Sequence, residues 1–260
     1  MGHNASNFKN DFNAEKVINE FLRKYFYQKI VDKNIIKAFR HITDPNLQHE
    51  GVDTIIITLR DVEVYIDEKA ALDYAKKNLT ENALPTFAFE ISYLNREGVL
   101  TEGWLTNSKY RKTEDYLLVW LWIKPDTKMK CLRCEDILQL EVIVLSKKDI
   151  LDTILYYATG DRCLTRFRQI ASKQRAFMLA KKLQQVAIED TISSVDLHLN
   201  EYSMENFMSK QTKSPIMKWY LTDISRKAEQ PLNIVVNKKI LKELAKSWWI
   251  ITTDNCIRKK

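Results

Sequence analysis

Glycine and proline are scarce in this chain, since its 260 residues contain only 5 of each. Long loops and low-complexity linkers are rich in these residues, so the composition argues against such segments. No apolar run is long enough to span a bilayer, and the longest, around YLLVWLWI, suits a buried strand. The opening residues, MGHNASNFKNDFN, are polar and do not resemble a signal peptide, so we expect a cytoplasmic protein without membrane segments.

Cysteine is also rare, and the motifs that would give it a function are missing. In a chain without an export signal the cysteines are expected to be reduced thiols. Cys131 and Cys134 form a C-x-x-C pair, but no second pair at zinc spacing and no nearby histidine accompany them. Buried or incidental cysteines are therefore favoured over a zinc site or a redox pair. A Gly-rich phosphate-binding loop is absent as well, so the common nucleotide-hydrolase motif is not present.

The hydrophobic and charged content of the chain indicates a globular protein, and its excess of basic residues favours an anionic partner. Hydrophobic residues make up 45% and charged residues 29% of the chain, which is typical of a globular protein with a substantial core. Lysine and arginine outnumber aspartate and glutamate by 41 to 34, which gives a net charge of +7. This excess favours an anionic partner such as a nucleic acid.

Residues 51–71, GVDTIIITLRDVEVYIDEKAA, contain two runs rich in Ile, Val, Thr and Tyr, separated by a short polar break. The pattern predicts an antiparallel hairpin with strands over 54–59 and 62–66. In such a pair the start of one strand lies beside the end of the other. Asp53 should therefore lie close to the charged group at 67–69.

The pairing register decides which of these charges meet. Strand alternation puts Asp67 and Lys69 on one face of the sheet and Glu68 on the other. A two-residue loop would place Asp53 opposite Glu68, whereas a loop one residue longer, or a bulge, would bring it level with Asp67 or Lys69. The sequence leaves the length of this loop open.

Two carboxylates and a lysine at one edge of a hairpin can hold Mg²⁺ or Mn²⁺ against a phosphodiester. Asp53, followed after a hydrophobic strand by Asp67-Glu68-Lys69, resembles the PD-(D/E)xK nuclease superfamily with its restriction-endonuclease-like fold. The resemblance implies that Asp53 and Asp67 bind the metal and that Lys69 completes the catalytic site. Val52 stands where the family has a proline. The alternative is that 67–69 are an ordinary charged strand end.

An amphipathic helix is predicted over residues 14–32, with a broad apolar stripe and Asn13 as its N-cap. In many members of the resembled superfamily the helix before the hairpin supplies a further acid to the metal site. Glu20 is the candidate here, and a solvated helix face is the equally weighted alternative. Glu90, on a predicted strand over 84–94, is a second candidate for an outer ligand.

The remaining pattern predicts a mixed α/β fold with a central mixed sheet of about five strands flanked by helices. Further strands are predicted over 102–105, 113–123 and 137–145, and the pattern then becomes mostly helical. We therefore expect a nuclease-like α/β core over residues 1–146. A mainly helical C-terminal part, packed on this core, is expected over 147–260.

A basic helix is predicted over residues 164–184, where no acidic residue occurs. Such a helix could follow the phosphates of a nucleic acid, because neutralising them releases counterions. A solvated basic face is the equally weighted alternative. The residues expected to contact nucleic acid are Arg166, Arg168, Lys173 and Arg175.

The pattern leads to a metal-dependent nuclease as the first hypothesis for function. Its cofactor is expected to be Mg²⁺ or Mn²⁺, and its substrate DNA rather than RNA. The second hypothesis is a nucleic-acid-binding or protein-interaction module that keeps the fold but does not cleave. The complete acid, acid and lysine set favours the first. The sequence leaves the specificity of cleavage and a homodimeric state open.

Overall fold

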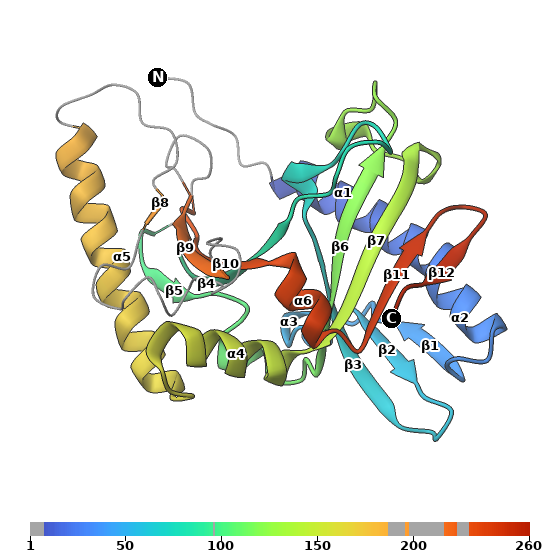
Figure 1. Cartoon of the computed structure of the whole chain (residues 1–260), viewed down its shortest axis with the longest axis horizontal. Coiled ribbons are helices and arrows are strands. Elements are labelled where there is room, and N and C mark those ends of the chain that lie inside the picture. The colour runs from blue at the N-terminus through green and yellow to red at the C-terminus, as the bar shows by residue number, and fades with distance from the viewer. Residues whose placement is uncertain (1–7, 96, 187–195, 198–215, 223–228) are drawn as a thin grey trace. The chain divides into compact units, whose positions relative to one another are not determined.

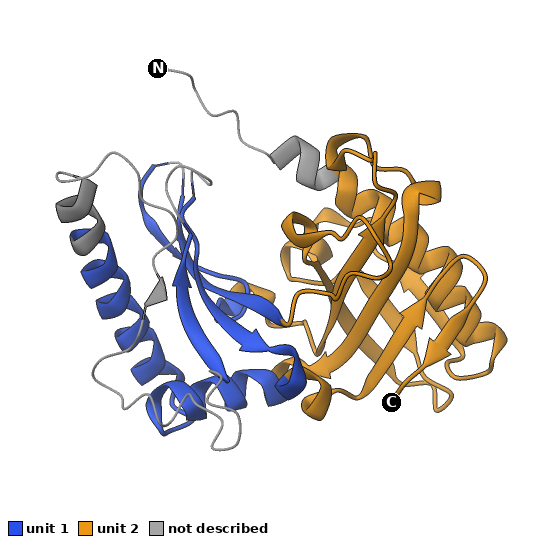
Figure 2. Cartoon of the chain, turned by 45° about the horizontal axis from the view of Figure 1, so that its top comes forward, with its two compact units in different colours: residues 1–4, 86–108, 149–240 blue, residues 5–85, 109–148, 241–260 orange. Residues whose placement is uncertain are grey.

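The computed structural model describes residues 8–95, 97–186, 196–197, 216–222 and 229–260. The chain forms two compact units, each assembled from segments that are far apart in the sequence. Unit 1 contains residues 1–4, 86–108 and 149–240, and unit 2 contains residues 5–85, 109–148 and 241–260 (Figure 2). Each unit has its own β-sheet.

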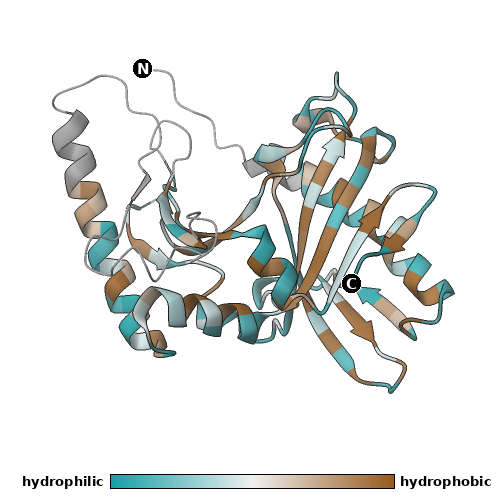
Figure 3. Cartoon of the chain, in the orientation of Figure 1, coloured by the Kyte–Doolittle hydropathy of each residue, from teal (hydrophilic) through white to brown (hydrophobic). Residues whose placement is uncertain are grey.

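Unit 2 is built on a mixed sheet of seven strands in the order β1-β2-β3-β6-β7-β11-β12 (Figure 1). Neighbouring strands are antiparallel except for β3 and β6, which run parallel. The central strand β6 is buried along its whole length, and Figure 3 colours much of β6 and β7 as hydrophobic. The strands are β1 (Ala38–His41), β2 (Thr54–Ile57), β3 (Glu63–Ala70), β6 (Asp115–Ile123), β7 (Ile137–Ser146), β11 (Ser247–Ile251) and β12 (Cys256–Arg258).

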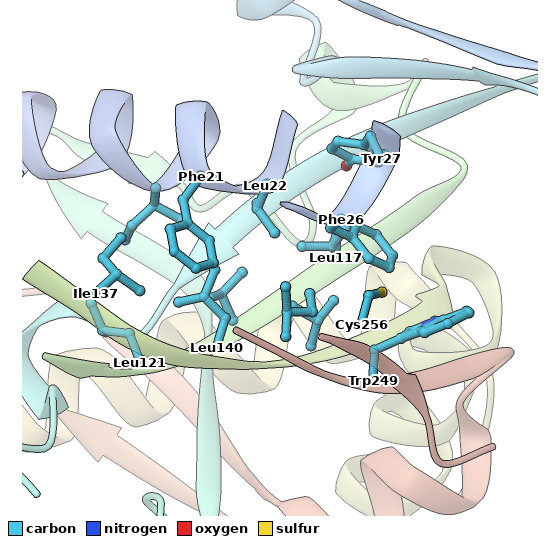
Figure 4. Close-up of a cluster of buried hydrophobic side chains, with 14 of the residues drawn as sticks. Phe21, Leu22, Phe26, Tyr27, Leu117, Leu121, Ile137, Leu140, Trp249 and Cys256 are labelled. Atoms are coloured by element: carbon cyan, nitrogen blue, oxygen red, sulfur yellow. The ribbon is translucent and has the colours of Figure 1, made fainter. Parts of the chain in front are cut away.

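The helix predicted over 14–32 is confirmed as α1 (Phe8–Leu22), a π-helical turn (Arg23–Tyr27) and α2 (Gln28–Asp32). It begins earlier than predicted, so Asn13 lies inside α1 and is not its N-cap. Its apolar stripe covers one face of the unit 2 sheet, because burying that stripe removes apolar surface from water. A short helix, α3 (Pro45–His49), precedes β2, and α6 (Lys238–Leu244) precedes β11. The core under the first helix includes Phe21, Leu22, Phe26, Leu117, Leu140 and Trp249 (Figure 4).

The predicted hairpin is confirmed, and its loop is the longer of the two considered. Thr54 pairs with Ile66 and Ile57 with Glu63, so three residues, 59–61, form the turn beyond the closing residues 58 and 62. Asp61 has a φ of 62°, the left-handed conformation that ends a common three-residue hairpin loop. This loop sets the register of every residue in β2 and β3.

Unit 1 contains a second sheet of five strands in the order β5-β4-β10-β9-β8. Its strands are β4 (Thr86–Leu94), β5 (Leu100–Glu102), β8 (Asp196–Leu197), β9 (Met217–Leu221) and β10 (Leu232–Asn237). Two helices belong largely to this unit, α4 (Lys147–Thr159) and α5 (Leu164–Val186). Phe167 of α5 stacks on Trp219 of β9 with ring centroids 5.7 Å apart, which anchors the helix to the sheet.

The mixed α/β class is confirmed, but two details of the predicted architecture differ in the structure. The described strands form sheets of seven and five, not one sheet of about five. The part after residue 147 contributes five strands, β8 to β12, as well as the helices α4, α5 and α6, among the described residues. The compact units alternate along the chain, which passes from one to the other at 85/86, 108/109, 148/149 and 240/241. None of the described helices has the length and apolarity needed to cross a membrane.

Candidate active site

Asp53 directly precedes β2, and its carboxyl lies close to that of Asp67 on β3. The regular pairing of β2 with β3 ends at Thr54 and Ile66, and the amide of Asp53 also donates to the carbonyl of Ile66, at 2.9 Å. The Oδ2 atom of Asp53 accepts a hydrogen bond from the amide of Glu68 at 2.8 Å. The side chain of Asp53 is therefore held against β3 beside Asp67.

Lys69 lies on the same face of β3 as Asp67, as strand alternation requires. Its Nζ atom is 2.5 Å from Oδ1 of Asp67, and the two side chains are 27% and 2% exposed, respectively. The second oxygen of Asp67, Oδ2, is buried and accepts no hydrogen bond from any of the described residues. A buried acceptor without a partner is costly, so this atom is suited to receive a cation.

The charged groups of the site shift one another's pKa values. The pKa of Asp67 is raised to about 7, because burial, the largest effect, and the carboxyl of Asp53 together outweigh the ammonium of Lys69, which lowers it. Burial lowers the pKa of Lys69, but the attraction of Asp67 and Asp53 outweighs it and leaves the pKa above its ordinary value. Two neighbouring carboxyls in a low-dielectric site resist ionising together, which favours binding of a positive ion.

Glu68 points to the opposite face of β3, toward the first helix. Its Oε1 atom accepts hydrogen bonds from the hydroxyls of Tyr27 and Thr54, both at 2.7 Å. The amide of Asn19 donates to Oε2 at 3.0 Å when its nitrogen faces the carboxyl. Burial raises the pKa of Glu68 to about 7, with Asp53 adding to the rise. Glu68 thus ties the helix to the strand that carries the acids and is not part of the acid pair.

The turn before Asp53 depends on a glycine. Gly51 has a φ of 82°, and a Cβ atom there would lie 2.5 Å from Oγ1 of Thr113 and 2.6 Å from Cδ1 of Tyr110. The carbonyl of Gly51 also accepts a hydrogen bond from the hydroxyl of Thr113 at 2.7 Å. This contact fixes the approach of the chain to Asp53.

We expect Gly51→Ala to destabilise the protein by about 2–4 kcal/mol, because it combines backbone strain with a clash that neighbours must relieve. Thermal unfolding would measure the loss. Gly160→Ala is the matched control, since Gly160 has a similar φ of 68° and open space around its Cα. Equal losses in the two variants would contradict the importance of the contacts with Thr113 and Tyr110.

Two further residues extend the site and were not found from the sequence. Tyr116 of β6 pairs with Asp67 in the parallel register, and burial and the nearby carboxylate hold its pKa well above the usual value. The ammonium of Lys147 donates to the carbonyl of Tyr110 and lies 5.9 Å from the centre of the Tyr116 ring. Burial lowers the pKa of Lys147, and the charges of Asp67 and Lys69 act on it in opposite directions. No local motif marks these residues, because they reach the site through pairings distant in the sequence.

The two additional acids suggested by the sequence do not join this pair. Glu20 is exposed on α1, and its charge acts on Lys24 and Cys134 instead of on Asp53 or Asp67. The prediction that Glu20 is a metal ligand is therefore wrong, because the side of α1 that faces β3 carries Asn19 at this position. Glu90 lies on β4 in the sheet of unit 1, where its charge acts on Arg175.

Arg175 of the predicted basic helix is a structural residue. It is 2% exposed, and its Nη1 atom donates to the carbonyl and the hydroxyl of Ser92, both at 3.1 Å. Its Nη2 atom donates to the carbonyl of Gln230 at 2.8 Å. The prediction that Arg175 contacts nucleic acid is corrected, because these bonds enclose the guanidinium inside unit 1.

The other three residues of α5 that were expected to contact nucleic acid differ from one another. Arg168 forms an ion pair with Glu102 and donates to the carbonyl of Thr106 at 2.8 Å, so its charge is already compensated. Arg166 and Lys173 are exposed. Only part of the predicted phosphate track is therefore accessible on this helix.

A divalent metal would meet two carboxylates here, not a complete protein cage. Over the described ranges, no group of three or more His, Cys, Asp and Glu side chains is arranged to hold a metal ion. Mg²⁺ is commonly bound through one or two carboxylates, with waters and substrate phosphates as its other ligands. Asp53 and Asp67, with the unpartnered Oδ2 atom of Asp67, fit this type of site.

Comparison of the chain with protein-family models, with curated proteins and with solved structures finds no match.

Proposed function

We propose that the protein is a metal-dependent phosphodiesterase of the PD-(D/E)xK type that cleaves nucleic acid, DNA rather than RNA. One observation carries the proposal: the buried Oδ2 atom of Asp67 has no hydrogen-bond partner in the described part of the chain, and it lies beside the carboxyl of Asp53 and two residues from Lys69. This arrangement places two oxygen donors for a cation next to an ammonium group. The net charge of +7 supports a polyanionic substrate.

Each residue has a separate role in this proposal. Asp53 and Asp67 would hold Mg²⁺ or Mn²⁺, which supplies Lewis acidity and an activated water when bound. Lys69 would stabilise negative charge on the attacked phosphate, because its ammonium is held at the site before the reaction begins. The amide of Glu68 orients Asp53 through its hydrogen bond to Oδ2. The carboxyl of Glu68 keeps β3 against the first helix and takes no part in the chemistry.

Binding of Mn²⁺ tests the proposal without requiring a substrate. Because the pKa of Asp67 is about 7, a cation must displace a proton from this carboxyl below that pH. We expect the affinity for Mn²⁺ to rise about tenfold per pH unit below pH 7 and to level off above it. Calorimetry in buffers of different ionisation enthalpy would measure the released proton, and nuclease assays with Mg²⁺ or Mn²⁺ would follow.

Asp53→Asn and Asp67→Asn should each abolish this binding, whereas Glu20→Gln, on the exposed side of α1, should leave it unchanged. Absence of Mn²⁺ binding by the wild type would contradict the proposal. So would binding that persists in both aspartate variants. Cleavage of single- and double-stranded DNA and RNA by the wild type would then identify the substrate class.

The alternative function is a nucleic-acid-binding or protein-interaction module that does not cleave. The observation that favours it is the small number of acids at the site, since no group of three metal-binding side chains occurs among the described residues. Binding of DNA without cleavage at any pH or metal concentration would support this alternative.

A further inference from the structure

Lys147 is a half-buried cation close to the acid pair. It is the first residue of α4, directly after β7, and its amide donates to the carbonyl of Glu114. Its ammonium donates to the carbonyl of Tyr110, and among the described residues it forms no ion pair with a carboxylate. A buried charge without a counter-ion is costly, so its neighbourhood is suited to an anion.

The strand register directs this ammonium toward the acids. Tyr116 lies on β6 between Asp67 of β3 and Leu145 of β7, in the same row of paired residues. The Lys147 ammonium lies over the ring of Tyr116, at 5.9 Å from its centre. It therefore extends from the β7 side toward Asp67, and the charges of Asp67 and Lys69 both affect its pKa.

Lys69 and Lys147 are not equivalent. The ammonium of Lys69 is in contact with Asp67, 2.5 Å from its Oδ1 atom, and so compensates a protein carboxylate. Lys147 interacts with a backbone carbonyl and an aromatic ring, both of which are neutral. Within the described part of the chain, the site thus combines an acceptor without a donor, Oδ2 of Asp67, with an ammonium that forms no ion pair with a carboxylate. A metal ion together with a phosphate group would satisfy both at once.

We propose that Lys147 binds a phosphate group of the nucleic-acid backbone beside the acid pair. This inference rests on the proposed function for the choice of substrate class. It does not require that the protein cleaves, because an ammonium can hold a phosphate whether or not the bond is broken. Lys147 is therefore assigned as a substrate-binding residue, with its contact made through charge and hydrogen bonding.

Fluorescence anisotropy with a labelled 20-base-pair DNA duplex and a labelled RNA strand of the same sequence tests this assignment. Ca²⁺ replaces Mg²⁺ so that binding is measured without relying on turnover. Lys147→Gln should weaken binding about tenfold or more at low salt, the effect of losing one charge-assisted hydrogen bond. It should also reduce the slope of log affinity against log salt by about one phosphate contact.

Two variants control for folding and for general charge. Lys148→Gln removes the same charge from the next, exposed residue of α4 and should change the affinity less than about twofold. Lys147→Arg keeps the charge and should retain most of the binding. Thermal unfolding of each variant would show whether the native fold is preserved.

The possible results separate this inference from the proposed nuclease activity. Equal affinity of the wild type and Lys147→Gln, or no binding of either probe by the wild type, would overturn the role of Lys147. Equal losses in Lys147→Arg and Lys147→Gln would also overturn it, because the charge would then be irrelevant. If Lys147→Gln weakens binding while Lys148→Gln and Lys147→Arg do not, and the wild type cleaves no nucleic acid, the role of Lys147 in binding would be supported. The proposed nuclease activity would then be refuted.

Discussion

Asp67→Asn is expected to remove cleavage almost completely, by about a thousandfold or more. The substitution keeps the shape of the side chain but removes the charge that would hold the metal, whose contribution to such reactions is several kcal/mol. Added Mg²⁺ or Mn²⁺ should rescue little, since the lost ligand cannot be replaced by mass action. Cleavage assays over a wide range of metal concentration would measure the effect.

The same variant should be more stable than the wild type at high pH in the absence of metal. Because folding raises the pKa of Asp67 from 3.8 to about 7, the folded protein binds more protons than the unfolded chain between these values. The stability contributed by this group is therefore present below about pH 4 and is lost as the pH rises through 7. Asparagine avoids this loss, which amounts to at most about 4 kcal/mol at about 1.4 kcal/mol per pKa unit.

The two results together separate chemistry from folding. An inactive Asp67→Asn protein that unfolds at a higher temperature than the wild type at pH 8 would support the site as described. Full activity in this variant would exclude Asp67 as a metal ligand. Loss of activity together with a lower unfolding temperature at pH 8 would contradict the burial of a charged Asp67.

Lys69→Ala is the second variant with a large expected effect, a loss in cleavage rate of about a hundredfold or more. This is the scale of losing one electrostatic contact that is oriented before the reaction. The ammonium of Lys69 opposes the rise in the pKa of Asp67, so its removal should raise that pKa further. Metal binding should therefore remain intact above about pH 8 but shift to higher pH. Rates at saturating metal, measured from pH 6 to pH 9, would separate the two effects.

Glu68→Gln is the matched control, because it removes a carboxylate one residue away on the opposite face of β3. A glutamine oxygen can keep the hydrogen bonds from Tyr27 and Thr54, and its amide can donate to the carbonyl of Asn19 after that group rotates. We expect less than about a threefold change in rate. An effect of Glu68→Gln as large as that of Asp67→Asn would contradict the assignment of this rim as the active site.

Much of the site was predictable because strand alternation is a local property. Asp67 and Lys69 are two residues apart in a β-branched run, so they had to share a face, and Glu68 had to lie on the other. The amphipathic helix over 14–32 followed in the same way from the spacing of its apolar residues. These features depend only on residues close together in the sequence.

The position of Asp53 beside Asp67 depends on the turn. A three-residue loop ending at Asp61, with its φ of 62°, sets the register. Asp61 can adopt this conformation more readily than most residues, but nothing in the sequence excluded the shorter loop. A loop shorter by one residue would have placed Asp53 opposite Glu68, whose side chain lies on the other face of β3 from Asp67.

Only the tertiary structure shows which strands and side chains that are distant in the sequence contact each other. Strands β4 and β10 pair across more than a hundred residues, so a count of strands could not show that two sheets form. In the sequence, Arg175 cannot be told from an exposed arginine of a basic helix. In the structure, its guanidinium is buried and donates to the carbonyls of Ser92 and Gln230. Lys147 reaches the acid pair only because β6 and β7 lie beside β3. The sequence by itself determined the local elements and the faces of their side chains. The pairing of those elements, which depends on non-local burial and hydrogen bonding, determined which charges meet.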